Sequence, residues 1–235
     1  VFIAAGGWEW GRLNGLGQGA SMGLGGITLA ACVASWAMGW QHAPQAAVWV
    51  PAGLAWLVCG SLLLRAGVAG WPHIAAPLRL IGGLLALWLT WLAVVQARLV
   101  GINFLLSTLV LVWVADIFAY FAGRAFGTRL VARKLAPSIS PGKSWEGVMG
   151  GMLGVVALAV AWVWADARYG ALVPSLYSLL ARAGWPLLVL VVLGLAAMSV
   201  VGDLVESLIK RSAGAKDSSG LLPGHGGVLD RVDAL

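Results

Sequence analysis

A long apolar stretch near the end of the chain decides the class of fold: P-L-L-V-L-V-V-L-G-L-A-A-M-S-V-V-G-D-L-V-E, residues 186–206. In a helix that rises about 1.5 Å per residue, about 20 apolar residues cross the hydrocarbon core of a bilayer. The rest of the chain has the same bias, because 60% of its 235 residues are hydrophobic and 10% are charged. A soluble domain carries about 25% charged residues. We therefore expect lipid, not water, around most of this chain.

Six segments are apolar enough to span a membrane. The predicted spans are residues 23–40, 46–64, 77–95, 99–123, 148–165 and 186–206. Residues 1–7 are typical of the end of a helix that starts upstream, so we expect a chain truncated at both ends. We predict an all-α fold, a polytopic transmembrane helix bundle with about six complete spans and a partial first one. Residues 1–235 are expected to form a single domain.

The basic residues divide unevenly between the two sides that these spans define. If residues 9–22 are cytoplasmic and the sides alternate, only Arg98, Arg168 and Arg182 of the 15 basic residues fall outside. This bias follows the positive-inside rule, and it places the polar segments 116–147 and 202–233 on the same cytoplasmic side. The net charge of +6 then reflects membrane orientation and capture of phosphate groups, and we expect no nucleic acid partner.

Three acidic residues lie in or at the ends of the predicted spans: Asp116, Asp203 and Glu206. A carboxylate at membrane depth is costly unless it is paired, so each is a candidate for function or for a structural ion pair between helices. On a helix, Asp203, Ser207 and Lys210 share one face. The cytoplasmic end of the last span therefore gathers groups of both charges.

A glycine-rich segment follows the last span: K-R-S-A-G-A-K-D-S-S-G-L-L-P-G-H-G-G, residues 210–227. Its glycines and proline exclude a regular helix, and its backbone amides can approach phosphate closely. Positive charge comes from Lys210, Arg211, Lys216 and Arg231. Hard oxygen ligands suited to Mg²⁺ are supplied by Asp217, Asp230 and Asp233. Both signs of charge suit a metal–triphosphate, and an ordinary solvated loop is the alternative.

The second polar segment contains G-R-A-F-G-T-R at residues 123–129 and P-S-I-S-P-G-K-S-W-E-G at residues 137–147. Gly142-Lys143-Ser144 is similar to the end of a Walker A loop. However, Pro137 stands where that motif requires glycine, and no strand is predicted before it. We therefore reject a P-loop here.

The polar segments resemble those of a known family. Residues 207–233 match S-x-x-K-R-x4-K-D-x5-P-x-H-G-G-x2-D-R-x-D at every fixed position, a pattern that resembles the signature of the phosphatidate cytidylyltransferase (CDP-diacylglycerol synthase) family. Residues 116–147 and 202–207 are similar to two further segments of that family, and Trp8-Glu9-Trp10 resembles a pair near its first helices. Members usually begin earlier and continue into one more helix, which agrees with the expected truncation.

The resemblance implies an enzyme that joins CTP and phosphatidic acid at the bilayer surface to give CDP-diacylglycerol and pyrophosphate, with Mg²⁺ as cofactor. It implies catalytic roles for Asp203, Asp230, Lys210, Arg211, Lys216 and Asp217. It implies substrate binding by Lys143, Ser144, Arg124, Ser207, His225, Gly226, Gly227 and Arg231. The implied metal ligands are Asp203, Asp230, Asp217 and Asp116. A bacterial inner-membrane location with a cytoplasmic site is expected, and the chain could form a homodimer.

Two other functions compete with this interpretation. A CTP-dependent membrane lipid kinase, of the dolichol- or phytol-kinase type, would share both membrane helices and nucleotide chemistry, but the complete signature argues against it. A transporter would bind ions near the middle of the bilayer, whereas the polar residues here gather at one predicted face. Release of pyrophosphate from CTP would distinguish the three.

Overall fold

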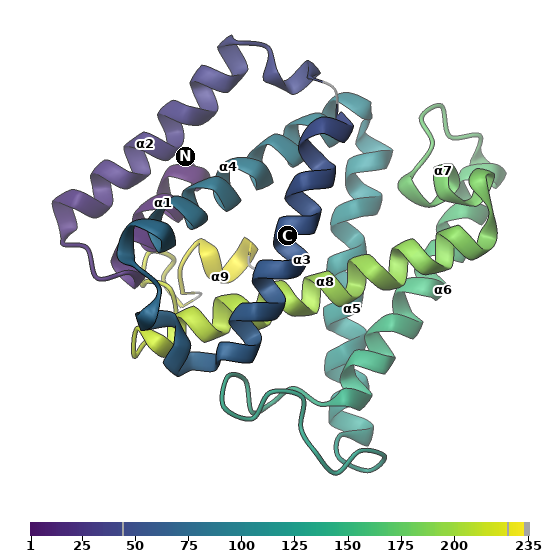
Figure 1. Cartoon of the computed structure of the whole chain (residues 1–235). Coiled ribbons are helices and arrows are strands. Elements are labelled where there is room, and N and C mark those ends of the chain that lie inside the picture. Colours follow the sequence, from purple (N-terminus) through teal and green to yellow (C-terminus); the bar gives the residue numbers. More distant parts are fainter. Residues whose placement is uncertain (44, 225, 233–235) are drawn as a thin grey trace. The chain divides into compact units, whose positions relative to one another are not determined.

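The computed structural model describes residues 1–43, 45–224 and 226–232. Over these residues the regular structure is helical, apart from two isolated bridges, Ala136 with Ser140 and Leu222 with Gly226. The long helices are α1 (Phe2–Leu13), α2 (Gln18–Ala37), α3 (Gln45–Gly70), α4 (Ala76–Val100), α5 (Ile102–Phe126), α6 (Trp145–Tyr169) and α8 (Trp185–Ser212) (Figure 1). The shorter helices are α7 (Leu176–Ala183) and α9 (Leu229–Val232), with the 3-10 turns η1 (Trp40–His42) and η2 (Trp71–His73).

Six of the described helices are long and apolar enough to cross a membrane, namely α2, α3 with η2, α4, α5, α6 and α8. This confirms the all-α, polytopic prediction, and we describe the chain as a multi-pass membrane protein. The predicted boundaries differ by a few residues. The first predicted span begins five residues too late and ends three residues too late, because α2 runs from Gln18 to Ala37.

The helices form two compact units. The first contains Val1–Gln96 and the described residues from Asp203 onward, and the second contains Ala97–Gly202. Helix α8 contributes residues to both. The single domain expected from the sequence stays a prediction.

In the first unit, α1 and α2 pack closely through small residues (Figure 1). A Cβ atom added at Gly25 would lie 2.5 Å from the carbonyl oxygen of Ala4, and one at Gly11 would lie 3.0 Å from Ser21. One at Gly7 would collide with Thr28. Small residues four apart let two helix backbones approach, which is a common means of helix association in membranes. This packing holds α1 and the carboxylate it carries.

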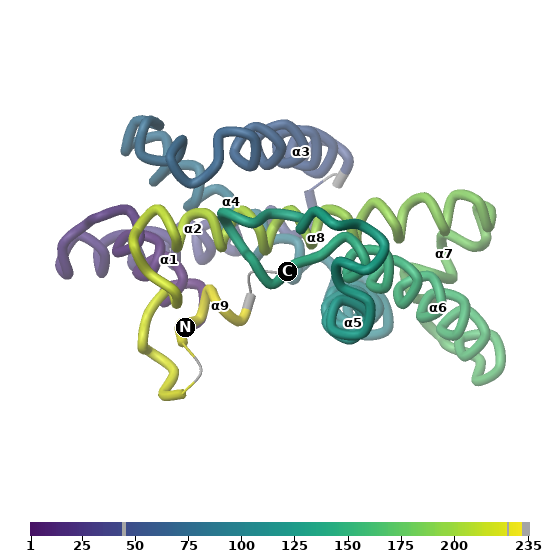
Figure 2. Tube along the Cα trace, turned by 90° about the horizontal axis from the view of Figure 1, so that it is seen from below, coloured from purple at the N-terminus to yellow at the C-terminus, as the bar shows by residue number. Residues whose placement is uncertain are grey.

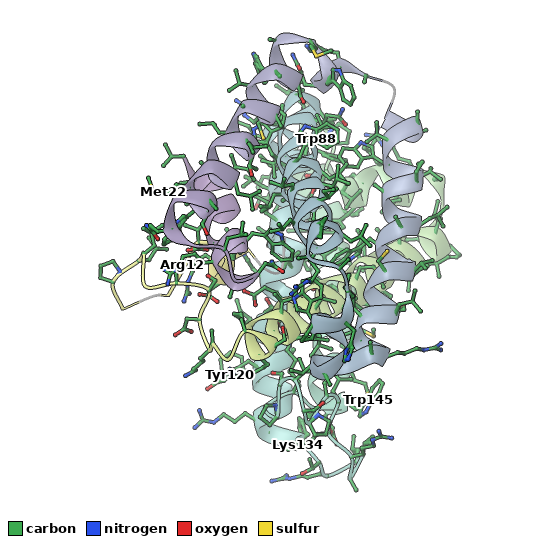
Figure 3. The ribbon with its side chains drawn as sticks, turned by 60° about the vertical axis from the view of Figure 1, so that its left-hand side comes forward. Arg12, Met22, Trp88, Tyr120, Lys134 and Trp145 are labelled. Carbon is green, nitrogen blue, oxygen red and sulfur yellow. The ribbon has the colours of Figure 1, made fainter. Side chains whose placement is uncertain are left out.

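Hydrogen bonds between side chains connect the longer helices of this unit. Trp49 Nε1 donates a hydrogen bond to Gln96 Oε1 at 2.8 Å. Trp88 Nε1 donates to Ser35 Oγ at 2.8 Å, and Figure 3 marks Trp88 on α4. Such bonds between membrane helices contribute only about 1 kcal/mol each, because the unfolded chain in the membrane also finds hydrogen-bond partners.

In the second unit, α5 and α6 pack through the glycines of α6. A Cβ atom at Gly147 would lie 2.9 Å from the carbonyl oxygen of Ala119, and one at Gly151 would lie 2.7 Å from that of Ala115. Gly150 and Gly154 face Ala122 and Phe118 in the same close way. The GxxxG spacing in this stretch therefore permits close helix packing.

Helix α7 is attached to the end of α6 by a half-buried carboxylate. Asp166 accepts hydrogen bonds from the hydroxyls of Ser175 and Ser178, both at 2.6 Å, and from the side-chain amide of Asn103 at 2.9 Å. Tyr177 is fully buried and donates its hydroxyl to the Ser107 carbonyl at 2.7 Å. These bonds explain the position of α7 at this end of α6, visible in Figure 2.

Candidate active site

A buried lysine joins two carboxylates at the end of α8. Lys210 is 9% exposed, and its Nζ lies 2.5 Å from Glu206 Oε2 and 2.7 Å from Asp230 Oδ1. Glu206 precedes Lys210 by one helical turn, while Asp230 comes from α9, beyond the glycine-rich segment. A buried ammonium is tolerated because it is paired and hydrogen-bonded on more than one side.

Asp230 is held by the loop as well as by Lys210. Its Oδ2 accepts hydrogen bonds from the backbone N–H of Ser218 at 2.8 Å and of Gly227 at 2.7 Å, and from the Ser218 hydroxyl at 3.0 Å. Burial by itself raises the pKa of the Asp230 carboxyl, but the hydrogen bonds from Lys210, Gly227 and Ser218 outweigh it and lower that pKa to about 2. The group is therefore a carboxylate at neutral pH.

The glycines of this loop make the tight path possible. Gly224 and Gly226 have φ values of 73° and 83°, in the left-handed region that favours glycine. Gly226 closes the loop by accepting a hydrogen bond from the Leu222 N–H at 2.8 Å. The N–H of Gly227, expected to bind substrate, donates to Asp230 here. The glycine-rich segment thus holds its own carboxylate in place.

A residue that the sequence analysis did not select closes the network. Glu9 of α1 is fully buried, and its carboxylate accepts hydrogen bonds from the loop across more than 200 positions of sequence. The donors are the hydroxyls of Ser218 (3.0 Å) and Ser219 (2.5 Å) and the N–H groups of Val228 (2.8 Å) and Leu229 (2.7 Å). A carboxylate in an apolar helix was the available signal, the same one that selected Asp116 and Asp203.

The remaining predicted residues of the first unit surround this network less closely. Asp203 Oδ1 accepts a long hydrogen bond of 3.4 Å from the Ser207 hydroxyl. Arg211 is exposed and donates to the Ala215 carbonyl at 3.1 Å. Three further charged side chains are exposed, those of Lys216, Asp217 and Arg231. The predictions for His225 and Asp233 lie outside the described residues.

The polar residues of the second unit lie at the ends of α5 and α6, where Figure 3 marks Tyr120, Lys134 and Trp145. Arg124 donates to the Tyr120 hydroxyl at 3.0 Å. Ser144, expected to bind substrate, caps α6 by accepting from the Gly147 N–H at 3.1 Å. Lys143 is half-buried and Asp116 is exposed.

Glu146 shapes the loop between α5 and α6 and was also not selected from the sequence. It is 3% exposed, and its Oε1 accepts from the N–H groups of Leu130 and Val131 at 2.9 and 2.8 Å. Glu146 lies in the first turn of α6, where a glutamate is common in any helix. The sequence therefore contains no sign that this side chain binds the loop backbone.

The carboxylate oxygens of this site are ligands of the kind that Mg²⁺ prefers. Among the described residues, however, no group of three or more His, Cys, Asp or Glu side chains converges on one point. A carboxylate offers about four acceptor positions. Oδ2 of Asp230 accepts from two backbone N–H groups and shares the Ser218 hydroxyl proton with Glu9, while Oδ1 accepts from Lys210. Oδ1 is therefore the oxygen that suits a cation. Mg²⁺ commonly takes only one or two carboxylates, with phosphate and water completing its shell, so a small set of ligands fits it.

The fold and this site together define a class: a multi-pass membrane protein in which a glycine-rich loop holds a carboxylate–lysine pair at the end of a spanning helix. The chain belongs to the cytidylyltransferase family, whose model matches residues 1–235. This confirms the family that the signature resembled.

Individual relatives agree with this assignment. The chain is 41% identical over 237 residues to the phosphatidate cytidylyltransferase of Pseudomonas aeruginosa, an alignment that covers 99% of this chain and 80% of that protein. It is 50% identical over 135 residues to the enzyme of that name from Haemophilus influenzae, covering 57% of this chain and 42% of that one. The enzyme of that name from Bacillus subtilis is 39% identical over 137 residues, covering 57% of this chain and 44% of the relative.

Proposed function

We propose that this chain transfers CMP from CTP to phosphatidate, giving CDP-diacylglycerol and pyrophosphate. The observation that carries the proposal is the buried Lys210–Asp230 pair, because it joins the two halves of the complete signature at the end of a spanning helix. Similarity along 99% of the chain to a protein named phosphatidate cytidylyltransferase supports it.

In this reaction a phosphate oxygen of phosphatidate bonds to the α-phosphorus of CTP, and the bond from that phosphorus to the bridging oxygen of pyrophosphate breaks. The nucleophile belongs to the lipid, so the chain needs no catalytic serine or cysteine. Its task is to bring two polyanions together and to stabilise the leaving pyrophosphate. The exposed cationic side chains Arg211, Lys216 and Arg231 suit that task.

The residues for substrate and metal follow from the same proposal. Bound Mg²⁺ would supply charge neutralisation at the phosphates. Asp203 and Asp230 of the first unit would hold it, with Asp217 as a supporting carboxylate, and the metal role expected for Asp116 stays a prediction. Lys143 and Arg124 of the second unit would bind CTP phosphates, and the basic residues of the loop would bind the lipid phosphate.

We also propose that the site faces the cytoplasm from a bacterial inner membrane. The uneven distribution of the 15 basic residues between the two predicted sides supports that orientation. CTP would then arrive from water and phosphatidate from the adjoining leaflet. The homodimer stays a prediction, which a measurement of the oligomeric state in detergent would test.

The test is an assay of the full-length protein in lipid vesicles with CTP and Mg²⁺. With phosphatidate as acceptor, we expect pyrophosphate and CDP-diacylglycerol in equal amounts. With a long-chain alcohol as acceptor, the competing lipid kinase would release CDP and form a lipid phosphate. CDP release without pyrophosphate would favour the kinase, and no consumption of CTP in either case would contradict both.

A further inference from the structure

Glu9 brings a buried negative charge to the glycine-rich loop. Its Oε1 accepts hydrogen bonds from Ser219 and Val228, while its Oε2 accepts from Leu229 and shares the single Ser218 hydroxyl proton with Asp230. A buried carboxylate is costly unless it is fully hydrogen-bonded. Glu9 therefore holds a defined conformation of the loop, because other conformations would leave its charge without donors.

Ser218 connects Glu9 to Asp230. Its hydroxyl lies 3.0 Å from Glu9 Oε2 and 3.0 Å from Asp230 Oδ2, while its N–H donates to Asp230 at 2.8 Å. The backbone is equally close, since a Cβ atom at Gly227 would collide with Ser218 Oγ and Glu9 Oε1. The two carboxylates thus share the Ser218 hydroxyl, and Gly227, which donates to Asp230, lies close to Glu9. A movement of the loop away from Glu9 would also move the donors of Asp230.

The connection continues from Asp230 to α8. Asp230 Oδ1 accepts from Lys210 Nζ at 2.7 Å, and Lys210 also contacts Glu206. A continuous series of hydrogen bonds and ion pairs therefore leads from α1 through the loop to the end of α8. Its first member, Glu9, belongs to a helix that carries none of the residues selected for chemistry.

We infer that Glu9 is a positioning residue for the proposed cytidylyl transfer: it fixes the loop so that Asp230 and Lys210 keep the orientation that the reaction needs. The inference rests on the proposed function. Glu9 acts through Ser218 and the loop backbone, and its own carboxylate is buried away from solvent. Its effect is therefore expected on the rate of the chemical step more than on nucleotide binding.

A glutamine at this position tests the requirement for charge and for acceptors. Glu9→Gln keeps the size of the side chain, but its NH₂ group would face donors where an oxygen now accepts. In the full-length purified protein, we expect kcat to fall by about 10²-fold, as for a misplacement of about 1 Å at a reacting centre. We expect a much smaller change in the KM for CTP, and a higher Mg²⁺ concentration for half-maximal rate.

Two serine variants separate the link to Asp230 from the contact with Glu9 alone. Ser218→Ala removes the hydroxyl that both carboxylates share, whereas Ser219→Ala removes a hydroxyl that donates to Glu9, accepts from the exposed Leu221 N–H and, among the described residues, does not bond to Asp230. We expect the Ser218 variant to lose more of kcat than the Ser219 variant. Trypsin cleavage after the exposed Lys216 gives a readout independent of activity, and it should be faster in Glu9→Gln than in the wild type.

The outcomes are distinguishable. A wild-type protein that releases no pyrophosphate overturns the proposed function, and this inference with it. An active wild type and a Glu9→Gln variant with equal kcat per folded molecule, the same Mg²⁺ requirement and equal trypsin sensitivity overturn the inference alone. If Glu9→Gln does not fold, equal kcat values for Ser218→Ala and Ser219→Ala overturn it instead.

Discussion

Lys210 and Asp230 form a buried ion pair of 2.7 Å between residues that lie 20 positions apart in the sequence. Lys210 lies in the last turn of α8 and Asp230 in the first turn of α9, so the pair determines how the glycine-rich loop leaves the end of the spanning helix. Glu206 lies on the other side of the same ammonium. A single positive charge thus separates two carboxylates.

Removal of that ammonium is expected to destabilise the first unit. Lys210→Met keeps the aliphatic length but removes the ammonium that Glu206 and Asp230 share. Breaking a buried ion pair costs about 3–5 kcal/mol of folding free energy. Thermal unfolding in detergent should show a clearly lower midpoint, and pyrophosphate release should fall below detection. Arg65→Met, which removes an exposed cation from the same unit, is the control. Equal midpoints for the two variants would contradict the structural role of Lys210.

Loss of charge at the proposed metal ligands should reduce the rate by orders of magnitude. Asp203→Asn and Asp230→Asn keep the size of each side chain and remove its charge, which weakens a bond to a hard cation. The measurement is a Mg²⁺ titration of pyrophosphate release, with size-exclusion profiles to show that the variants still fold. A variant with near-normal activity across the titration would exclude that residue, and Asp217 would then be the next candidate ligand of the first unit.

The loop of the second unit should contain one lysine that matters for CTP. We expect Lys143→Ala to raise the KM for CTP or abolish activity, because alanine cannot supply charge near the triphosphate. Arg133→Ala is the matched control, since Arg133 is exposed and lies outside the recognisable pattern. Equal tolerance of the two changes, measured over a range of CTP concentrations, would show that this segment is only a surface loop.

The close packing of α5 and α6 predicts different effects for two glycines. Gly151→Ala should destabilise the second unit by about 1–3 kcal/mol, because its Cβ would lie 2.7 Å from the Ala115 carbonyl oxygen. Gly194→Ala, on α8, meets nothing within 4 Å and should be neutral or slightly stabilising. Thermal unfolding of both variants tests this. A midpoint for Gly151→Ala at or above that of Gly194→Ala would contradict the packing.

The predicted topology can be tested with single cysteines at exposed positions of two loops. Leu172 and Gly220 are both exposed, whereas Ser175 and Ser218 of the same loops are buried in hydrogen-bonded networks. In a chain whose exposed Cys59 is replaced by serine, Leu172→Cys and Gly220→Cys should react with an impermeant reagent from opposite sides of the membrane. Reaction of both from one side would show that the predicted number of spans is wrong.

The sequence by itself determined the membrane class, the six spans and the two polar segments. Hydropathy is a local property, which about 20 consecutive residues are enough to show. The family signature is also local, because it lies in one continuous segment, residues 207–233. Small residues four apart likewise indicate close helix packing, as the glycines of α6 show. Even so, span ends were misplaced by a few residues, in α3, α6 and α8 because the helix continues beyond its apolar stretch into the polar interface, where its backbone is still hydrogen-bonded.

The partners of the charged groups were decided only by the tertiary structure. Lys210, Ser218 and Asp230 were visible as members of a polar segment, but nothing local indicates that the Gly227 amide binds Asp230 or that Ser144 caps a helix. Glu9 is the strongest case, since its donor at Val228 lies 219 positions away. A buried carboxylate takes whichever donors the packed helices bring to it, and that choice depends on how α1 packs beside the loop.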